Sequence, residues 1–336
     1  MNKVLSIQYL RAVAALMVVF HHARIPYEGF QSPLNGLSFG QAGVDIFFVI
    51  SGFIMYSTAE RARAGDFLRR RLIRIVPMYW IAILVTLLIK TGMFHTDFSL
   101  KDIGLSLAFI PHYHLIHTDK IWPYLIPGWT LNFEMLFYGL FALALMTKRL
   151  ILVLSGSILG LVIAGLLVKN SNALWSTYTH PLLLEFLVGV FIARATRDGV
   201  SPWWSLLVIP AALVFCFGPS TEEARVIWWG MPAAMIVIGA VAYEQNQTLP
   251  NWKILKDIGD ASYSIYLFQF IAFSFSTSLM ASPAGGGIGQ NAVMIISAMV
   301  CATGLGLSYI TWWSVPSRGP CPRPLPNQTP AAHFRG

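Results

Sequence analysis

Apolar residues occur in long, nearly uninterrupted runs along most of this chain, and short connections separate the runs. About 20 residues of α-helix cross the hydrocarbon core of a bilayer. We place ten segments of about this length at residues 5–23, 41–58, 76–92, 128–146, 150–168, 181–197, 203–218, 226–243, 262–280 and 292–313. The pattern therefore predicts an all-α integral membrane protein, a bundle of about ten transmembrane helices.

Composition strengthens this prediction. Of the 336 residues, 56% are apolar and 11% are charged, and the mean hydropathy is +0.62. An ordinary soluble domain is about 25% charged. The first segment is not expected to be a cleaved signal peptide, because Arg11 interrupts its apolar core and no small-residue cleavage site follows.

The last part of the chain differs from the rest. Residues 316–336 contain six prolines and show no apolar stripe, and proline cannot continue a helix. Such a segment cannot bury enough surface to offset the entropy of ordering. We therefore expect a membrane domain at residues 1–313 and a disordered, Pro-rich tail at residues 314–336.

Lysine and arginine predict the orientation, because cytoplasmic loops carry an excess of them. With the N-terminus inside, sixteen of the 23 lie in inner segments, six lie in outer segments, and Arg11 lies within the first span. Both termini are therefore expected in the cytoplasm. Nucleic-acid binding is not expected, because the basic residues sit at the ends of spans and not on one folded surface.

Arg11 and His22 are the first candidates for chemistry. A guanidinium in the middle of a bilayer costs roughly 3 kcal/mol or more, so it is seldom kept without a partner or a task. Eleven helical steps return to nearly the same face, about 16 Å further along the axis. Arg11 is therefore expected to act as a binding group and His22 as a base, while His21 should point elsewhere.

Two carboxylates are expected at the depth of His22. Asp45 begins the second predicted span and Glu134 lies in the first turns of the fourth, both near the outer side. A carboxylate is the usual partner that orients a histidine and raises its basicity. We therefore predict a catalytic group of His22, Glu134 and Asp45. The alternative is that both carboxylates cap helix starts, where they meet the positive end of the macrodipole.

Four arginines precede the third predicted span. Arg71 and Arg74 are three residues apart, so they share a helix face and can bind phosphates together. The alternative is an anchor for anionic lipids. Arginine is used here in place of lysine, and its planar fork suits phosphate recognition.

A metal site is not expected. His112, His114 and His117 form an H-x-H-x-x-H run, but no cysteine or acidic residue stands at ligand spacing.

Five sequence blocks follow one another between residue 8 and about residue 313. They read Leu10-Arg11-Ala-Val-Ala-Ala-Leu followed by His22; Gly43-Val-Asp45-Ile-Phe-Phe-Val-Ile-Ser51-Gly52-Phe53; Arg70-Arg71-x-x-Arg74-Ile-x-Pro77-x-Tyr79; Trp129-Thr-Leu-Asn132-Phe-Glu134-x-x-Phe137-Tyr138; and Ser262-Tyr263-Ser264-Ile-Tyr266-Leu267. In content and order they resemble the acyltransferase 3 family of membrane acyltransferases, and within it the bacterial O-acetyltransferases of exopolysaccharide.

The resemblance implies a multi-pass enzyme of the bacterial inner membrane. It implies acyl-CoA, in particular acetyl-CoA, as a co-substrate from the cytoplasm, a carbohydrate acceptor, and no permanently bound cofactor. It matches the family's arginine–ten residues–histidine signature to Arg11 and His22, and its R-x-x-R motif to Arg71 and Arg74. Where many relatives have a histidine this chain has Gln269, so a second histidine there is not essential.

We therefore expect an O-acyltransferase that acts on a cell-surface or exported saccharide. Arg71 and Arg74 would hold the CoA phosphates, Arg11 the thioester or the arm that carries it, and His22 would deprotonate the acceptor hydroxyl. A variant mechanism uses His22 as the nucleophile. The alternative functions are a transporter that uses Arg11 as a substrate counter-ion and a scaffold subunit of a polysaccharide export machine. Expected partners are membrane lipids and the polysaccharide biosynthesis machinery.

Overall fold

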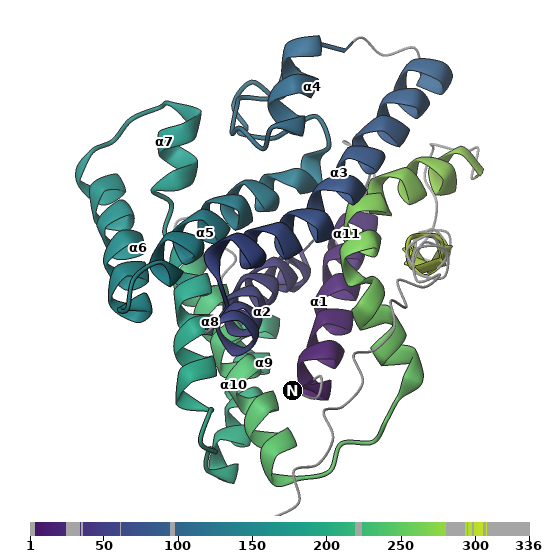
Figure 1. Cartoon of the computed structure of the whole chain (residues 1–336). Coiled ribbons are helices and arrows are strands. Elements are labelled where there is room, and N and C mark those ends of the chain that lie inside the picture. Colours follow the sequence, from purple (N-terminus) through teal and green to yellow (C-terminus); the bar gives the residue numbers. More distant parts are fainter. Residues whose placement is uncertain are drawn as a thin grey trace, which may run out of the picture.

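The computed structural model describes residues 4–24, 34, 36–60, 62–94, 98–218, 224–279, 293, 295–297, 299–304 and 307, and within these ranges the chain is helical with no strand. The elements are α1 (Leu5–Ala23), η1 (Phe39–Gln41), α2 (Ala42–Ala59), α3 (Ala64–Phe94), α4 (Leu100–Leu107), η2 (Ile126–Gly128), α5 (Trp129–Leu145), α6 (Leu150–Leu167), α7 (Ala173–Tyr178), α8 (Leu183–Ala195), η3 (Pro202–Leu207), α9 (Val208–Phe217), η4 (Val226–Gly230), α10 (Met231–Asn246) and α11 (Lys253–Leu279). Figure 1 shows their arrangement.

Seven helices in the described ranges are long and apolar enough to cross a membrane. They are Leu5–Ala23, Phe39–Ala59, Ala64–Gly92, Ile126–Leu145, Leu150–Leu167, Ala173–Ala195 and Val226–Asn246. The protein is therefore an all-α, multi-pass membrane protein, as predicted.

The predicted number of ten spans is not confirmed. The segment at 203–218 forms a shorter apolar helix, Pro202–Phe217, and the segment at 262–280 falls within α11. The segment at 292–313 lies mostly outside the described residues, where Ile295–Gly304 is the apolar helix that remains. The predicted tail at 314–336 lies wholly outside them.

The third predicted span begins earlier than expected. We placed its start at residue 76, but α3 begins at Ala64 and runs through Pro77. The prediction followed hydropathy, which detects the apolar part of a helix and misses the basic turns that precede it. Arg71 and Arg74 therefore belong to the body of α3.

Glycines allow the central helices to touch. A β-carbon at Gly52 of α2 would lie 1.9 Å from the carbonyl oxygen of Phe186 in α8, and one at Gly189 of α8 would lie 2.0 Å from the carbonyl oxygen of Val49. A β-carbon at Gly43 would lie 2.5 Å from the carbonyl oxygen of Ala14 in α1. Contact at these positions holds α2 between α8 and α1.

The first helix is capped by a distant part of the chain. No side chain within α1 caps its N-terminus. The Glu244 carboxylate of α10 accepts hydrogen bonds from the backbone N–H groups of Leu5 (2.8 Å) and Ser6 (2.9 Å), and from the Ser6 hydroxyl (2.6 Å). These bonds satisfy donors that every helix leaves open at its start, and they fix the depth of α1.

Candidate functional site

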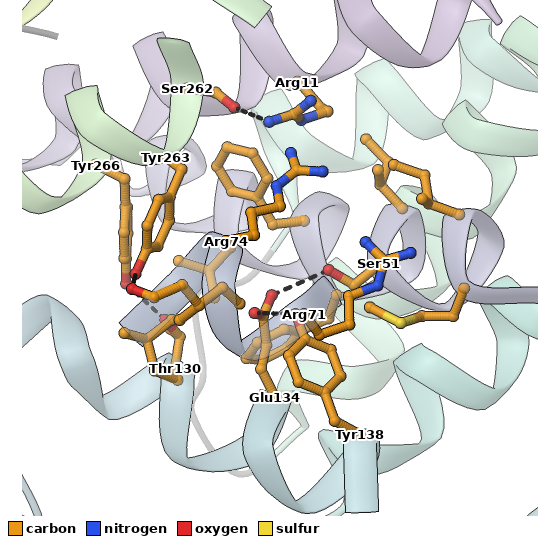
Figure 2. A pocket seen from close by; sticks show the side chains of 18 residues that line it. Arg11, Ser51, Arg71, Arg74, Thr130, Glu134, Tyr138, Ser262, Tyr263 and Tyr266 are labelled. Carbon is orange, nitrogen blue, oxygen red and sulfur yellow. Dashed lines mark hydrogen bonds between the residues drawn. The ribbon is translucent and has the colours of Figure 1, made fainter. Parts of the chain in front are cut away.

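Two cavities lie between α1, α2, α5 and α11, and the first is rich in arginine. It encloses about 770 Å³ of space, part of it open to solvent. We call it the arginine cavity (Figure 2). Its charged and hydroxyl-bearing lining residues are Arg11, Ser51, Arg71, Arg74, Thr130, Glu134, Tyr138, Ser262, Tyr263 and Tyr266.

Arg11 enters this cavity from α1. Its side chain is buried, with 7% of its surface exposed, and it donates to the side-chain oxygens of Gln8 (3.2 Å) and Ser262 (2.9 Å). Both acceptors are neutral, and Arg11 forms no ion pair with the residues that the structure describes. A buried guanidinium is costly unless its donors are satisfied, so Arg11 is well suited to a ligand that accepts hydrogen bonds.

Arg71 and Arg74 enter the same cavity from α3, and the R-x-x-R spacing does place both on one face. Arg71 donates to the Thr58 hydroxyl (3.1 Å) and lies over the Phe67 ring. Arg74 forms no hydrogen bond or ion pair with any described residue, and Figure 2 shows it reaching toward Arg11. Both arginines also line a neighbouring surface groove with Arg70, so they stand between the cavity and the outside.

Glu134 lies in the arginine cavity and not beside His22. Its carboxylate accepts hydrogen bonds from the hydroxyls of Ser51 (3.0 Å) and Tyr138 (2.8 Å) (Figure 2). The expectation that Glu134 lies beside His22 and orients its ring is therefore wrong. Among the charged residues of this lining, three guanidinium groups face one carboxylate, which leaves an excess of positive charge.

The second cavity contains both histidines of α1, and we call it the histidine cavity. It encloses about 1,410 Å³ of space, part of it open to solvent. Its polar and aromatic lining residues are His21, His22, Gln41, Lys120, Trp122, Trp129, Phe133, Ser176, Thr177, His180, Arg225, Tyr266, Gln269 and Phe270. The sequence predicted that His21 points elsewhere, but it lines the same cavity, because a cavity this wide takes in more than one face of α1.

The two histidines have different hydrogen bonds. Nδ1 of His22 lies 2.9 Å from the carbonyl oxygen of Val18 and so carries the proton. This leaves the lone pair of Nε2 to act as a base. Nδ1 of His21 instead accepts from the Arg24 guanidinium (3.1 Å). A backbone carbonyl therefore sets the tautomer of His22, and no carboxylate is needed for it.

Gln269 stands beside His22 in the lining. The side chain is fully buried, and its amide nitrogen donates to the carbonyl oxygen of Tyr266 (3.0 Å). Its Oε1 has no hydrogen-bond partner among the described residues. The glutamine thus offers one acceptor to this cavity.

Asp45 lies in neither lining. It is fully buried and forms a two-point ion pair with Arg225, from Nε to Oδ1 (3.0 Å) and from Nη2 to Oδ2 (2.9 Å). Arg225 packs on the Trp229 ring at 4.9 Å and lines the histidine cavity. The predicted convergence of His22, Glu134 and Asp45 is thus not seen, because their depths were estimated from the sequence but the directions of their side chains were not.

Sequence reasoning missed Arg225 and Glu185. Glu185 is buried within reach of Asp45, and neither of its carboxylate oxygens has a hydrogen-bond donor in the part of the chain that the structure describes. The signal was present in the sequence, since Glu185 is the one acidic residue of the predicted span 181–197 and such residues are functional candidates by default.

The histidines of the loop that follows α4 have other partners. Nε2 of His112 lies 2.5 Å from Oδ1 of Asp102. Burial lowers the pKa of His114, whose Nδ1 accepts from the backbone N–H groups of Ile116 and His117 (both 3.1 Å). Within the described ranges no group of three or more His, Cys, Asp or Glu side chains is arranged to hold a metal ion.

Comparison with known proteins identifies a family and three named relatives. The family model described as an acyltransferase domain matches residues 4–313. The exopolysaccharide production protein ExoZ of Rhizobium meliloti (strain 1021) is 37% identical over 285 residues, which cover 80% of this chain and 86% of that protein. The acyltransferase MdmB of Streptomyces mycarofaciens is 24% identical over 340 residues, covering 89% and 85% of the two chains.

The third relative is nodulation protein 10 of Rhizobium leguminosarum bv. viciae. It is 26% identical over 325 residues, which cover 78% of this chain and 81% of that protein. No solved structure is significantly similar to this chain.

Proposed function

Because this chain belongs to the acyltransferase family that its residues 4–313 match, and is therefore an acyltransferase, we propose that it transfers an acetyl group from acetyl-CoA to a hydroxyl of a cell-surface or exported saccharide. The similarity to a protein of exopolysaccharide production supports a polysaccharide acceptor. The transporter and scaffold alternatives involve no acyl transfer, so they do not account for a chain that belongs to an acyltransferase family.

The arginine cavity binds the phosphates of the donor in this proposal. Arg71 and Arg74 stand where the cavity meets the surface groove, and guanidinium groups bind phosphate oxygens in pairs. Arg11, deeper in the same cavity, holds the polar pantetheine arm of acetyl-CoA, which carries the thioester. Glu134 fixes Ser51 and Tyr138 and offsets part of the positive charge.

His22 acts as the general base. Its Nε2 removes the proton from the acceptor hydroxyl while the hydroxyl oxygen attacks the thioester carbonyl carbon. The carbon–sulfur bond then breaks, the acyl–oxygen bond is complete, and the imidazolium returns its proton to the CoA thiolate. Val18 orients the ring through its carbonyl oxygen, and Asp45 contributes indirectly by holding Arg225 at the acceptor's cavity.

The acceptor enters the histidine cavity. Trp122 and Trp129 provide flat apolar faces of the kind on which sugar rings stack, and Arg225 and Gln269 provide a donor and an acceptor. The excess of basic residues in the predicted inner segments supports a cytoplasmic arginine cavity and an outward histidine cavity, with both termini in the cytoplasm and the protein in the bacterial inner membrane.

The observation that carries this proposal is that one helix, α1, presents Arg11 to a cavity of three guanidinium groups and His22 to a second cavity. The test is to incubate purified protein with acetyl-CoA and polysaccharide from a strain that lacks the enzyme. We expect free CoA thiol and ester-linked acetyl groups to appear together in equal amounts. Release of CoA without acetylated saccharide, or no consumption of acetyl-CoA, would contradict the proposal.

A further inference from the structure

Four helices pass from one cavity to the other. Along α1, Arg11 lines the arginine cavity and His22 the histidine cavity; along α11, Ser262 lines the first and Gln269 the second. Helix α2 has the reverse order along the chain, since Val44 lines both cavities and the later residues of α2 line the first alone, and α5 lines both cavities with alternating residues. The cavities therefore follow one another along the helix axes, and a donor held by Arg71 must reach past the boundary to meet His22.

Two residues form this boundary. Val44 of α2 and Tyr266 of α11 are the residues that line both cavities. Both side chains are almost fully buried, with 6% and 7% of their surfaces exposed. The boundary is thus made of one branched aliphatic side chain and one aromatic ring, and it has no charge.

Tyr266 is held in place. Its hydroxyl donates to the carbonyl oxygen of Pro127 (3.0 Å) and lies 3.2 Å from the Thr130 hydroxyl. Its ring also packs edge-on against Phe47, with 6.3 Å between the ring centroids. Because the Tyr266 side chain is held at its hydroxyl and packed against Phe47, its ring cannot rotate freely out of the boundary.

The backbone behind Val44 is also held. The preceding residue, Gly43, brings α2 against the carbonyl oxygen of Ala14 in α1, and a β-carbon there would lie 2.8 Å from Cγ2 of Val18. Because α1 and α2 are in contact at this level, Val44 cannot retreat without separating the two helices. The width between Val44 and Tyr266 is therefore set by packing.

We propose that Val44 and Tyr266 form the constriction through which the acyl-bearing arm of the donor reaches His22, and that its width restricts the enzyme to small, unbranched acyl groups. This inference rests on the proposed function. A linear arm with an acetyl group has a small cross-section, whereas a branched acyl group must displace one of two immobile side chains. Packed protein interiors resist such displacement.

The experiment compares transfer from acetyl-CoA and isobutyryl-CoA in three variants. Val44→Ala widens the constriction, and Val44→Leu narrows it. Val49→Ala is the matched control, because Val49 is also buried on α2 and lines neither cavity. Binding of CoA itself is measured for every variant, and unchanged binding shows that the protein is folded with its arginine cavity intact.

We expect Val44→Ala to raise the ratio of isobutyryl to acetyl transfer about tenfold or more, as removal of a methylene-sized group does in other selective pockets. Val44→Leu should lower acetyl transfer by a similar factor and leave CoA affinity as in the wild type. An unchanged ratio in Val44→Ala, or an equal change in Val49→Ala, would overturn the constriction. If the wild type transfers no acetyl group from acetyl-CoA, the proposed function itself fails, and this inference fails with it.

Discussion

Asp45 of α2 and Arg225, which directly precedes η4, are 180 residues apart and form a buried ion pair through two hydrogen bonds of 3.0 and 2.9 Å. Glu185 of α8 lies beside the pair, and no described residue donates a hydrogen bond to its oxygens. Two buried carboxyl groups therefore share one guanidinium. A second negative charge in this apolar setting would be costly, so we predict that the two carboxyl groups retain one proton between them.

The first prediction tests this shared proton. The loss of unfolding free energy in Asp45→Asn should be partly compensated, because Glu185 can lose its proton and become the counter-ion of Arg225. Glu185→Gln should be mild, since an amide resembles the protonated acid. The double variant removes both counter-ions, and its loss of unfolding free energy should exceed the sum of the two single losses by about 1 kcal/mol or more. Thermal unfolding of the four purified proteins measures this coupling, and additive losses would contradict it.

The second prediction concerns the base. His22→Ala should lower turnover about a hundredfold or more, because it removes the imidazole that takes the acceptor proton in the proposed mechanism. His21→Ala is the matched control on the adjacent position of α1. Its Nδ1 is engaged by Arg24, so we expect a much smaller loss. Rates of CoA release with saccharide acceptor provide the measurement, and equal losses in the two variants would refute the assignment.

The third prediction concerns the donor. Arg71→Lys and Arg74→Lys keep the charge but remove the planar fork, so both should raise the KM for acetyl-CoA more than the KM for the saccharide. Arg63→Lys serves as the control, since Arg63 lines neither cavity nor the groove. If all three variants titrate with acetyl-CoA as the wild type does, Arg71 and Arg74 only anchor lipids.

The fourth prediction concerns the packing of α2 on α8. A methyl group at Gly52 would overlap the carbonyl oxygen of Phe186, so Gly52→Ala should lower the unfolding free energy by about 1–3 kcal/mol or more. Gly139→Ala is the matched control, because a β-carbon at that position of α5 meets no atom within 4 Å. Thermal unfolding in detergent compares the two, and equal midpoints would show that the helices can separate without cost.

Much of the fold was predictable from the sequence, because hydropathy and length are properties of single segments. The predicted span 5–23 coincides with α1. Arg71 and Arg74 were correctly paired by their spacing, since a three-residue step within one helix always shares a face. Arg11 was singled out by the cost of placing a guanidinium in a bilayer, and the structure places it buried in the arginine cavity.

The grouping of the site was less predictable, because it depends on how helices are rotated against each other. Glu134 and Asp45 were assigned the depth of His22, but Glu134 turns toward the arginine cavity and Asp45 toward Arg225. Arg225 was counted as an outer basic residue, and nothing local to it shows that its partner is 180 residues away.

The cap that Glu244 provides for α1 has a consequence for the biogenesis of the enzyme. The two ends of this contact are separated by 238 residues of sequence, so the ribosome has made most of the membrane domain before the carboxylate exists. Until then the first amide groups of α1 lack the acceptor that Glu244 provides in the described structure, and one of the contacts that fix the depth of α1 is missing. We therefore expect Arg11 and His22, which keep a fixed spacing on α1, to reach their final depth in the membrane only after α10 has been inserted.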